Sequence, residues 1–419
     1  MSAKTKILLL VGDGMGDRPL GRLGGQTPLE AANRPALDRL AVEGECGLLD
    51  PIAPGVRAGS DTSHLSLLGY DPHTTYTGRG PFEAAGIGLD IKSGDICFRC
   101  NFATIEKGLV RDRRAGRISS GTDQLAAALN GLQLGEVTCY FRESVEHRAA
   151  LLLRGAGLGH QVSDVDPHEE GVAPHQAVGQ GPRDRKTAAA VNEFVKRSME
   201  ALDHHPVNEQ RRKEGKPPAN IVLPRGAGVA PHLQPFLERY GLKAAAVVET
   251  GLIAGIARYL GMTLPQVPGA TGGRDTDELA LARAVIAMLA DHDFVLCNLK
   301  CPDLGGHDDD PEDKIRAIEK MDRLVAYVVE HLRGPARRSL GEGGPAHVAV
   351  TADHSTPCEV GDHSGDPVPI VFWGPGVRSD GCRSYSERGV LGGGVGRIRG
   401  TDIMPILTNL GGWQEKFGA

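Results

Sequence analysis

The chain has 419 residues, of which 40% are hydrophobic and 24% are charged, an ordinary composition for a soluble globular protein. This length exceeds what one hydrophobic core usually serves, so it predicts two domains. The net charge of -6 gives no electrostatic reason to bind nucleic acid or a membrane surface, and we expect neither as a partner.

The N-terminal stretch MSAKTKILLLVGDG contains an apolar run that is too short for a signal peptide or a membrane-spanning helix. No later stretch is long enough to span a bilayer, so we expect a cytoplasmic protein. The 8 cysteines are scattered along a long chain, which argues against a disulfide framework. Cys97 and Cys100 form a single C-x-x-C, which favours two thiols in a strand over a zinc site.

Strand and helix patterns alternate at both ends of the chain. KILLLVGDGMGD (6–17) is an unbroken apolar run, typical of a parallel strand covered on both faces, and the helical spacing of residues 27–44 follows it. Near the C-terminus the pattern predicts a strand and polar loop over 293–310, an amphipathic helix over 311–332, a second strand and loop over 346–356, and a further strand over 367–377.

The middle of the chain has a different pattern. Short strands with charged connections are predicted over 94–118, 136–155 and 158–171, then a helix over 185–206 and a charged, proline-bearing linker over 208–220. Strand and helix return over 241–262. We therefore expect an α/β protein. A doubly wound domain would comprise residues 1–76 and 222–419, and a smaller α+β domain would be inserted at 77–221.

Acidic and histidine side chains follow three of the predicted strands. In open α/β sheets ligands bind beyond the carboxyl ends of the strands, so these residues should converge on one rim. Any one of them could be a turn or structural residue, but three such clusters favour metal binding. Six ligands are too many for one metal with an open position and fit two metals that share a phosphate. The six are Asp13, Asp303, His307, Asp353, His354 and His363.

Two other motifs near the N-terminus allow alternatives. GDGMGD suggests a dinucleotide-binding turn, but Asp17 stands where the third glycine of G-x-G-x-x-G belongs and would repel a pyrophosphate. Ser60, in RAGSDTSHLSLLGYDP, precedes a predicted helix, and locally it is best explained as an N-cap. The predicted metal cluster favours the other explanation, in which Ser60 is an activated nucleophile.

Motifs along nearly the whole chain, in order, resemble those of the archaeal-type 2,3-bisphosphoglycerate-independent phosphoglycerate mutases, members of the alkaline phosphatase superfamily. The resemblance implies an alkaline-phosphatase-like catalytic domain with an inserted lid. The motifs are GDGMGDRPL, GSDTSHLSLLGYDP, TGRGPFEAAGIGLD, FRCNFAT, DRRAGRI, VSDVDPH, KPPANIVLPRGAG, VPGATGG, PDLGGHD and TADHSTPCEVGDHSGDPVPI.

The resemblance also implies a chemistry and a ligand set. The reaction would interconvert 3-phosphoglycerate and 2-phosphoglycerate through a phosphoserine on Ser60, with two divalent metals and no 2,3-bisphosphoglycerate. Manganese is our first choice of metal, with magnesium, cobalt and zinc as alternatives. One metal would be held by Asp13, Ser60, Asp353 and His354, and the other by Asp303, His307 and His363. The two Asp-His pairs at 353–354 and 362–363 would thus serve different metals, and Asp362 has no assigned role.

The anionic substrate implies guanidinium groups in the inserted domain, because arginine grips carboxylate and phosphate with two hydrogen bonds. Asp112 is the candidate acid/base for the hydroxyl groups, and His64, four residues after Ser60, is a candidate for orienting the serine. Some of the arginines should be ordinary solvated charges. The candidates are Arg79, Arg111, Arg113, Arg114, Arg117 and Arg148.

The sequence departs from the family pattern at one point. Better-known bacterial relatives place a lysine near the nucleophile, but the matching residues 249–257 contain none, and Lys300 could supply that charge. The competing functions are a metal-dependent phosphatase or phosphonate hydrolase, a homoserine-kinase-like phosphotransferase, and a metal-stabilised binding module. The oligomeric state stays open.

Overall fold

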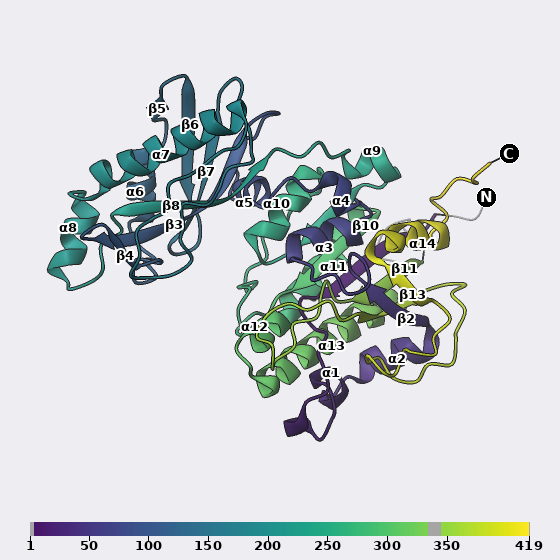
Figure 1. The fold of residues 1–419 in the computed structure, drawn as a ribbon. Coiled ribbons are helices and arrows are strands. Elements are labelled where there is room, and N and C mark those ends of the chain that lie inside the picture. Colours follow the sequence, from purple (N-terminus) through teal and green to yellow (C-terminus); the bar gives the residue numbers. More distant parts are fainter. Residues whose placement is uncertain (1–3, 334–344, 419) are drawn as a thin grey trace. The chain divides into compact units, whose positions relative to one another are not determined.

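The computed structural model describes residues 4–333 and 345–418, which fold into two compact units (Figure 1). The first unit comprises Met1–Thr75 and Gln234–Ala419, and the second is Tyr76–Leu233. Within the described ranges, no helix combines the length and the apolar character that a membrane crossing requires.

The first unit is built on a seven-stranded sheet. Its centre is parallel, because β1 pairs in parallel with β10 and β11, and β10 with β9. β12 runs antiparallel between β11 and β2, and β13 returns parallel to β2. Ile7–Gly12 of β1 are buried, as the unbroken apolar run predicted, and so is every residue of β10 and β11. The strands in sheet order are β13 (Gly396–Arg399), β2 (Glu45–Asp50), β12 (Val368–Trp373), β11 (Ala346–Thr351), β1 (Lys6–Gly12), β10 (Phe294–Leu299) and β9 (Ala244–Val247).

The register of the central strands determines where the polar loops begin. Gly12 lies opposite Leu299, and Val11 lies opposite Thr351. The three strands therefore end level with one another, and the chain leaves the sheet at one edge in all three places. This alignment brings residues that are about 290 and 340 positions apart in the sequence into one cluster.

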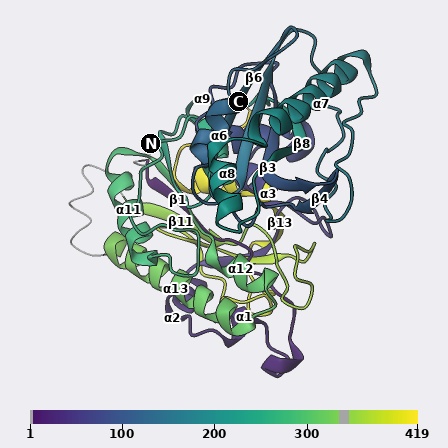
Figure 2. The ribbon, with the colours of Figure 1, turned by 90° about the vertical axis from the view of Figure 1, so that its left-hand side faces the viewer.

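Helices cover both faces of this sheet, and the expected doubly wound α/β fold is confirmed (Figure 1). α13 packs on α11, α12, α1 and α2 (Figure 2), whereas α3 packs on α10. The helices are α1 (Pro28–Ala31), α2 (Pro35–Glu43), α3 (Ser60–Leu67), α4 (Pro72–Thr75), α9 (Phe236–Tyr240), α10 (Gly251–Tyr259), α11 (Glu278–Asp291), α12 (Cys301–His307), α13 (Pro311–Arg333) and α14 (Ile403–Leu410).

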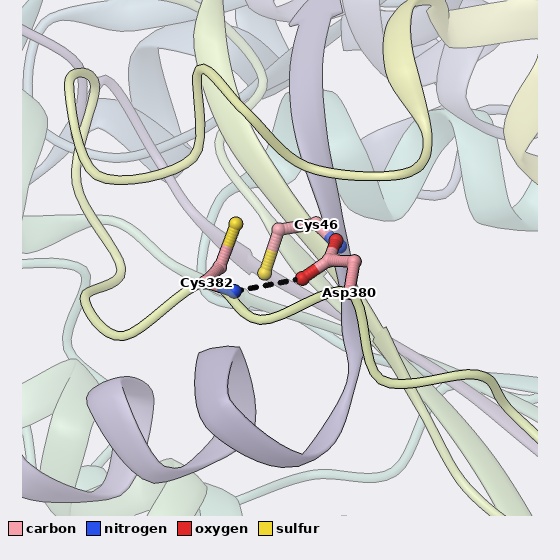
Figure 3. A group of neighbouring side chains, drawn as sticks. All are labelled: Cys46, Asp380 and Cys382. Carbon is pink, nitrogen blue, oxygen red and sulfur yellow. Dashed lines mark hydrogen bonds between the residues drawn. The ribbon is translucent and has the colours of Figure 1, made fainter.

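The segment between β12 and β13 folds back onto the amino end of β2. The carboxylate of Asp380 accepts hydrogen bonds from the backbone N–H of Cys46 in β2, at 2.5 Å, and of Cys382, at 3.0 Å (Figure 3). A single side chain thus holds two cysteines from distant parts of the sequence against each other.

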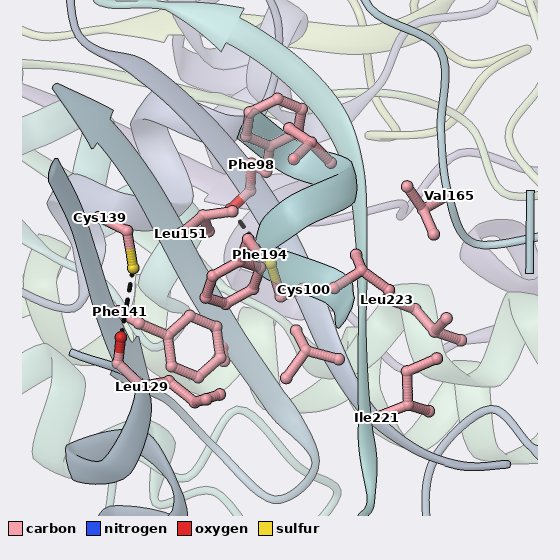
Figure 4. Close-up of a cluster of buried hydrophobic side chains, with 14 of the residues drawn as sticks. Phe98, Cys100, Leu129, Cys139, Phe141, Leu151, Val165, Phe194, Ile221 and Leu223 are labelled. Atoms are coloured by element: carbon pink, nitrogen blue, oxygen red, sulfur yellow. Dashed lines mark hydrogen bonds between the residues drawn. The ribbon is translucent and has the colours of Figure 1, made fainter. Parts of the chain in front are cut away.

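The second unit contains a six-stranded antiparallel sheet in which β3 is central. α6 and α7 pack on one face around Phe98, Phe141 and Phe194 (Figure 4), and α5 packs on the other. The elements are β3 (Ile96–Glu106), β4 (Leu109–Asp112), β5 (Gln133–Leu134), β6 (Val137–Glu143), β7 (Arg148–Arg154), β8 (Ile221–Val229), α5 (Gly80–Gly86), α6 (Thr122–Leu129), α7 (Pro182–Leu202) and α8 (Pro206–Lys213).

The cysteines of the C-x-x-C motif lie on opposite faces of β3. Cys97 packs with Ala84 of α5, whereas Cys100 belongs to the larger core beneath α6 and α7. A separation of three residues in a strand produces this result, because successive side chains alternate between faces. The two thiols therefore cannot ligate one metal together, and the prediction of two thiols in a strand is confirmed.

Four sequence expectations need correction. β8 pairs with β3, so the second unit extends to Leu233 and the boundary expected after residue 221 lies too early. The first part of the charged linker, up to Lys213, belongs to the helix α8, and the polar loop after β10 contains the helix α12. No named strand lies within residues 158–171, which form only an isolated bridge between Val162 and Gly179. Prolines and glycines in α12 and β8 interrupt the periodic patterns by which a helix or a strand is recognised in a sequence.

Candidate active site

The ends of β1 and β11 bring a first group of candidate ligands together. Ligand atoms of Asp13, Asp353 and His354 all lie within 4.8 Å of one another, and all three residues are buried. Nε2 of His354 is 3.2 Å from Oδ2 of Asp353 and 3.8 Å from Oδ1 of Asp13. The backbone N–H of Gly14 donates to Oδ1 of Asp353 and so joins the two loops.

A second group surrounds Asp303. Nε2 of His307 is 3.4 Å from Oδ2 of Asp303, and Nε2 of His363 is 3.6 Å from its Oδ1. The rings of His354 and His363 stack with centroids 3.6 Å apart, so the two groups adjoin each other. All six acids and histidines predicted from the strand ends therefore meet at this rim.

The helix α12 explains the spacing of Asp303 and His307. Residues four apart share one face of a helix, so both side chains reach the same point. Glycine is required around them: Gly14 has a left-handed φ of 60°, and a Cβ there would lie 2.5 Å from Oδ1 of Asp303. A Cβ at Gly306 would lie 2.2 Å from the carbonyl oxygen of Thr356.

Two of the histidines are oriented by backbone carbonyls. Nδ1 of His307 lies 2.9 Å from the carbonyl oxygen of Gly361, and Nδ1 of His363 lies 2.8 Å from that of Ala58. A carbonyl only accepts hydrogen bonds, so Nδ1 carries the proton and Nε2 is free to present its lone pair to a cation in the neutral ring.

The cluster holds three carboxylates around one ammonium group. Nζ of Lys300 bridges Asp13 and Asp303 at 2.8 and 2.5 Å. Oδ2 of Asp353 is buried and has no hydrogen-bond partner among the described residues. Burial, and then the neighbouring Asp13, hold the pKa of Asp353 well above its ordinary value. Such an arrangement suits divalent cations, which would satisfy the unpaired oxygen and displace the proton.

The charge of Asp303 also affects His307. The hydrogen bond from His307 to Asp303 is the largest influence, and it raises the pKa of His307 to about 9. Metal binding at this position would therefore have to remove a proton from the imidazole. Burial, followed by the nearby His363, lowers the pKa of His354 well below its ordinary value, so His354 is neutral and ready to coordinate.

Ser60 is the first residue of α3, and its side chain faces the first group of ligands. Its Oγ lies 3.2 Å from Nε2 of His354. Gly59 occupies the N-cap position, so the N-cap explanation of Ser60 is wrong. Nδ1 of the fully buried His64 lies 2.7 Å from the carbonyl oxygen of Ser60, which fixes the first turn of the helix.

Two residues missed in the sequence support this rim. Nδ2 of Asn298 donates to Oδ2 of Asp13 at 3.1 Å and lies 3.2 Å from Nε2 of His64, so it couples a predicted ligand to the serine helix. Lys314 is fully buried, and its Nζ donates to the carbonyls of Gly16 and Thr356 and to Oδ2 of Asp17, each at 2.8 Å.

Both residues left a signal in the sequence. Asn298 interrupts an otherwise apolar buried strand, and Lys314 stands on the apolar stripe of α13, four residues before Ile318. A buried lysine with three acceptors joins the loop that carries Asp13 to the loop that carries Asp353.

A second polar cluster lies wholly within the other unit. Arg99 and Arg225 face each other as register partners on β3 and β8. Their Nε atoms are buried without a hydrogen-bond partner among the described residues, 3.8 Å from Glu83 and 3.6 Å from Asp166 respectively. Burial, and then the neighbouring arginines, lower the pKa of Arg99 to about 9. We call Arg79, Arg99, Arg113, Arg148 and Arg225 the arginine cluster.

Three of the predicted arginines, Arg79, Arg113 and Arg148, belong to this cluster. Arg113 makes two 2.8 Å hydrogen bonds to the buried Asp166, and Arg79 makes a 2.9 Å hydrogen bond to Glu83. The other three, Arg111, Arg114 and Arg117, lie outside it and are exposed, although Arg114 and Arg117 add to the effect of burial and Arg148 in lowering the pKa of His147.

Asp112 shapes the turn that follows it. Its two oxygens accept hydrogen bonds from the backbone N–H of Arg114 and Gly116, each at 2.7 Å. This gives Asp112 a clear structural role, and its assignment as an acid/base stays a prediction.

Comparison with known proteins agrees with this architecture. The family model for 2,3-bisphosphoglycerate-independent phosphoglycerate mutase matches residues 41–208. Relatives with that name from Methanothermobacter thermautotrophicus and Thermococcus kodakarensis are 52% and 47% identical, and each alignment covers 99% of this chain and 100% of the relative.

Solved structures show the same similarity. A protein from Pyrococcus horikoshii is 42% identical with a TM-score of 0.86, and 100% of both chains is covered. The cofactor-independent phosphoglycerate mutase from Thermoplasma acidophilum is 38% identical with a TM-score of 0.71 over 97% of this chain and 100% of that one. By sequence and by structure, the chain belongs to the family of 2,3-bisphosphoglycerate-independent phosphoglycerate mutases.

Proposed function

We propose that the chain interconverts 3-phosphoglycerate and 2-phosphoglycerate, without 2,3-bisphosphoglycerate, through a phosphoserine on Ser60. The position of Ser60 carries the proposal, because its Oγ lies 3.2 Å from His354 at the centre of the ligand-rich rim. A hydroxyl at a helix start beside cation ligands is suited to attack phosphorus.

The rim would hold two divalent metals. Asp13, Ser60, Asp353 and His354 would ligate one, and Asp303, His307 and His363 the other, with manganese as our first choice and magnesium, cobalt or zinc as alternatives. When bound, the metals would polarise the phosphoryl group and activate the serine hydroxyl. The carbonyl-oriented histidines and the unpaired Asp353 oxygen support this assignment.

Ser60 would carry out both halves of the reaction. Its Oγ gives up its proton and forms a bond to phosphorus, while the bond from phosphorus to the O3 atom of glycerate breaks and O3 takes up a proton. Glycerate then turns, its O2 hydroxyl gives up a proton and attacks the same phosphorus, and the bond to Ser60 breaks as Oγ takes a proton back. Asp112 would be the acid and base for the two glycerate hydroxyls. His64 holds the backbone of the serine turn during both transfers, so the nucleophile stays in place.

Lys300 would contribute a positive charge to this chemistry. In the structure its ammonium group is bonded to Asp13 and Asp303. Cations on these two carboxylates would replace those contacts and release the ammonium group toward the phosphoryl oxygens. Lys300 would then replace the lysine that bacterial relatives place near the nucleophile.

The arginine cluster would hold the anionic groups of the substrate. Five guanidinium groups gather around Glu83 and Asp166, and two of them have Nε atoms without hydrogen-bond partners among the described residues. A carboxylate or phosphate would satisfy these donors with paired hydrogen bonds. We propose that the unit at 76–233 acts as a lid, which excludes water so that the phosphoserine is not hydrolysed.

A coupled assay tests the proposal. Metal-stripped protein would be supplied with manganese and 3-phosphoglycerate without 2,3-bisphosphoglycerate, and 2-phosphoglycerate would be detected through enolase while free phosphate is followed in parallel. Metal-dependent 2-phosphoglycerate with little phosphate is expected. Phosphate alone would mean a hydrolase, and ATP-dependent phosphorylation of homoserine would mean a kinase-like relative. A cytoplasmic location stays a prediction.

A further inference from the structure

We propose that Cys46 and Cys382 are a redox-sensitive pair that closes into a reversible disulfide. Their sulfur atoms and a carboxylate oxygen of Asp380 all lie within 4.8 Å of one another (Figure 3). Both thiols are free in the structure. A modest change in side-chain torsions would bring the sulfurs to the bonding distance of about 2 Å.

The backbone is already held in place for this bond. Asp380 accepts hydrogen bonds from the N–H groups of Cys46 and Cys382, so one carboxylate fixes both cysteines relative to each other. Gly394 also donates to Asp380, at 2.8 Å, and the N–H of Val395 donates to the carbonyl of Cys46 at 3.0 Å. Because the loop is anchored on both sides of Cys382, closure needs little backbone movement, which is the usual obstacle to a disulfide.

A metal is the obvious alternative ligand for two thiols and a carboxylate. The carboxylate of Asp380, however, already accepts three backbone hydrogen bonds, with both oxygens in use. Burial is the largest cause that raises the pKa of both thiols, which keeps them protonated. Two neutral sulfurs without a third available ligand make a poor metal site and a suitable disulfide precursor.

Cys382 is the accessible member of the pair. It is 8% exposed, whereas Cys46 is fully buried, and the other six cysteines are at most 1% exposed. The flanking residues Gly381 and Arg383 are exposed. A small disulfide reagent can therefore reach Cys382 first, and Cys46 is the resolving thiol behind it.

The chemistry balances as two thiol–disulfide exchanges. The thiolate of Cys382 attacks one sulfur of a low-molecular-weight disulfide, which forms a mixed disulfide and releases one thiol. The thiolate of Cys46 then attacks the sulfur of Cys382 and releases the second thiol. The protein loses two electrons and two protons, and the reagent gains both as two thiols. The raised thiol pKa values imply that the reaction takes hours.

The pair lies away from the candidate active site. Cys46 is at the amino end of β2, which runs parallel to β1, whereas Asp13 follows the carboxyl end of β1. The bond should therefore leave mutase activity within about twofold of the reduced enzyme. It should raise the unfolding midpoint by about 5 °C, because it would close a very long loop of the chain.

The test is peptide mapping of the full chain after incubation with oxidised glutathione. Free thiols would be blocked with an alkylating reagent before digestion, and Cys382→Ser and Cys46→Ser would serve as controls. We expect a Cys46–Cys382 cross-linked peptide that dithiothreitol removes, a higher unfolding midpoint, and unchanged activity. In Cys46→Ser we expect only the glutathione adduct on Cys382.

Three outcomes would overturn the proposal. The first is that both thiols are still alkylated after oxidation, the second is that a different cysteine pair is cross-linked, and the third is that native mass spectrometry finds a metal that protects both thiols. Because peptide mapping of the unmodified chain reads the bond directly, the result stands even if a serine variant folds poorly.

Discussion

The polar clusters of the two units differ in their charged groups. In the first unit, Asp13, Asp303 and Asp353 gather around one ammonium group, and burial and Asp13 raise the pKa of Asp353, so that it keeps a proton that a cation would displace. In the second, five guanidinium groups gather around two carboxylates, and the strand partners Arg99 and Arg225 repel each other.

This contrast indicates what each cluster is for. A buried rim of carboxylates and oriented imidazoles provides ligands for divalent cations, whereas a cationic sheet face with unpaired donors attracts carboxylate and phosphate. Both arrangements cost stability in the ligand-free protein, and such a cost is expected where binding groups are preorganised. Substitutions in each cluster test this contrast.

The largest effect is expected for Ser60→Ala. Without a hydroxyl to accept the phosphoryl group, mutase activity should fall by roughly 10⁴-fold or more. Manganese binding should persist, because six other ligands are still in place. The coupled assay and an equilibrium manganese titration would measure the two properties. Near-normal turnover in the variant would rule out the serine route.

Arg225→Met is expected to lower kcat/KM by about 10²- to 10³-fold, because a buried donor to the substrate is lost. The unfolding midpoint should stay the same or rise, since removing Arg225 relieves the cost of burying its charge and its repulsion from Arg113 and Arg79, which together outweigh its attraction to Asp166 and Asp164. Arg111→Met, at an exposed position on β4, is the matched control and should change kcat/KM less than about threefold. Equal losses in both variants would show that the cluster has no special role.

Lys314→Met should lower manganese affinity by about 10- to 100-fold, because the loops that carry Asp13 and Asp353 lose their shared anchor. Lys320→Met, on the same helix and bonded to the carbonyl of Thr276, is the control and should bind normally. Electron paramagnetic resonance of free manganese would give both affinities. A variant with lower stability but unchanged manganese affinity would show that Lys314 has only a structural role.

The smallest effect is expected for Asp166→Asn, at about 2 kcal/mol of unfolding free energy at neutral pH. Burial opposes ionisation of Asp166, but hydrogen bonds from Arg113 and His168 outweigh it and lower its pKa. A lowered acid pKa stabilises the fold above the ordinary value of about 3.9, and the gain is lost as pH falls. Urea unfolding should show the two proteins converging below about pH 4. A difference that persists in acid would refute this assignment.

The carboxylate-rich rim was predictable because its residues follow the most regular part of the chain. Largely apolar runs locate the ends of β1, β10 and β11, and parallel strands end on one side, so Asp13 and Asp353 could be placed together from sequence. The geometry within the rim was harder to predict from the sequence. Pro302 and two glycines made α12 resemble a loop, and the anchoring role of Lys314 is visible only in the tertiary structure.

The arginine cluster was harder to predict because it depends on antiparallel register. Arg99 and Arg225 are 126 positions apart, and only the pairing of β3 with β8 puts them opposite each other. In sequence, each looks like an ordinary polar residue of a strand, while the arginine-rich stretch around Arg113 attracts attention instead. The end of the second unit was predicted too early because Pro224 and the glycines after it interrupt the strand pattern of β8.

The most direct test of the central claim is chemical quenching of the enzyme during turnover. Manganese-loaded protein would be mixed with 3-phosphoglycerate, stopped in acid at millisecond intervals, and digested for mass spectrometry, with 2-phosphoglycerate measured in the same samples. We predict a phosphorylated Ser60 peptide that requires metal and is absent from Ser60→Ala. Formation of 2-phosphoglycerate while the Ser60 peptide stays unmodified at every time point would contradict the proposed mechanism.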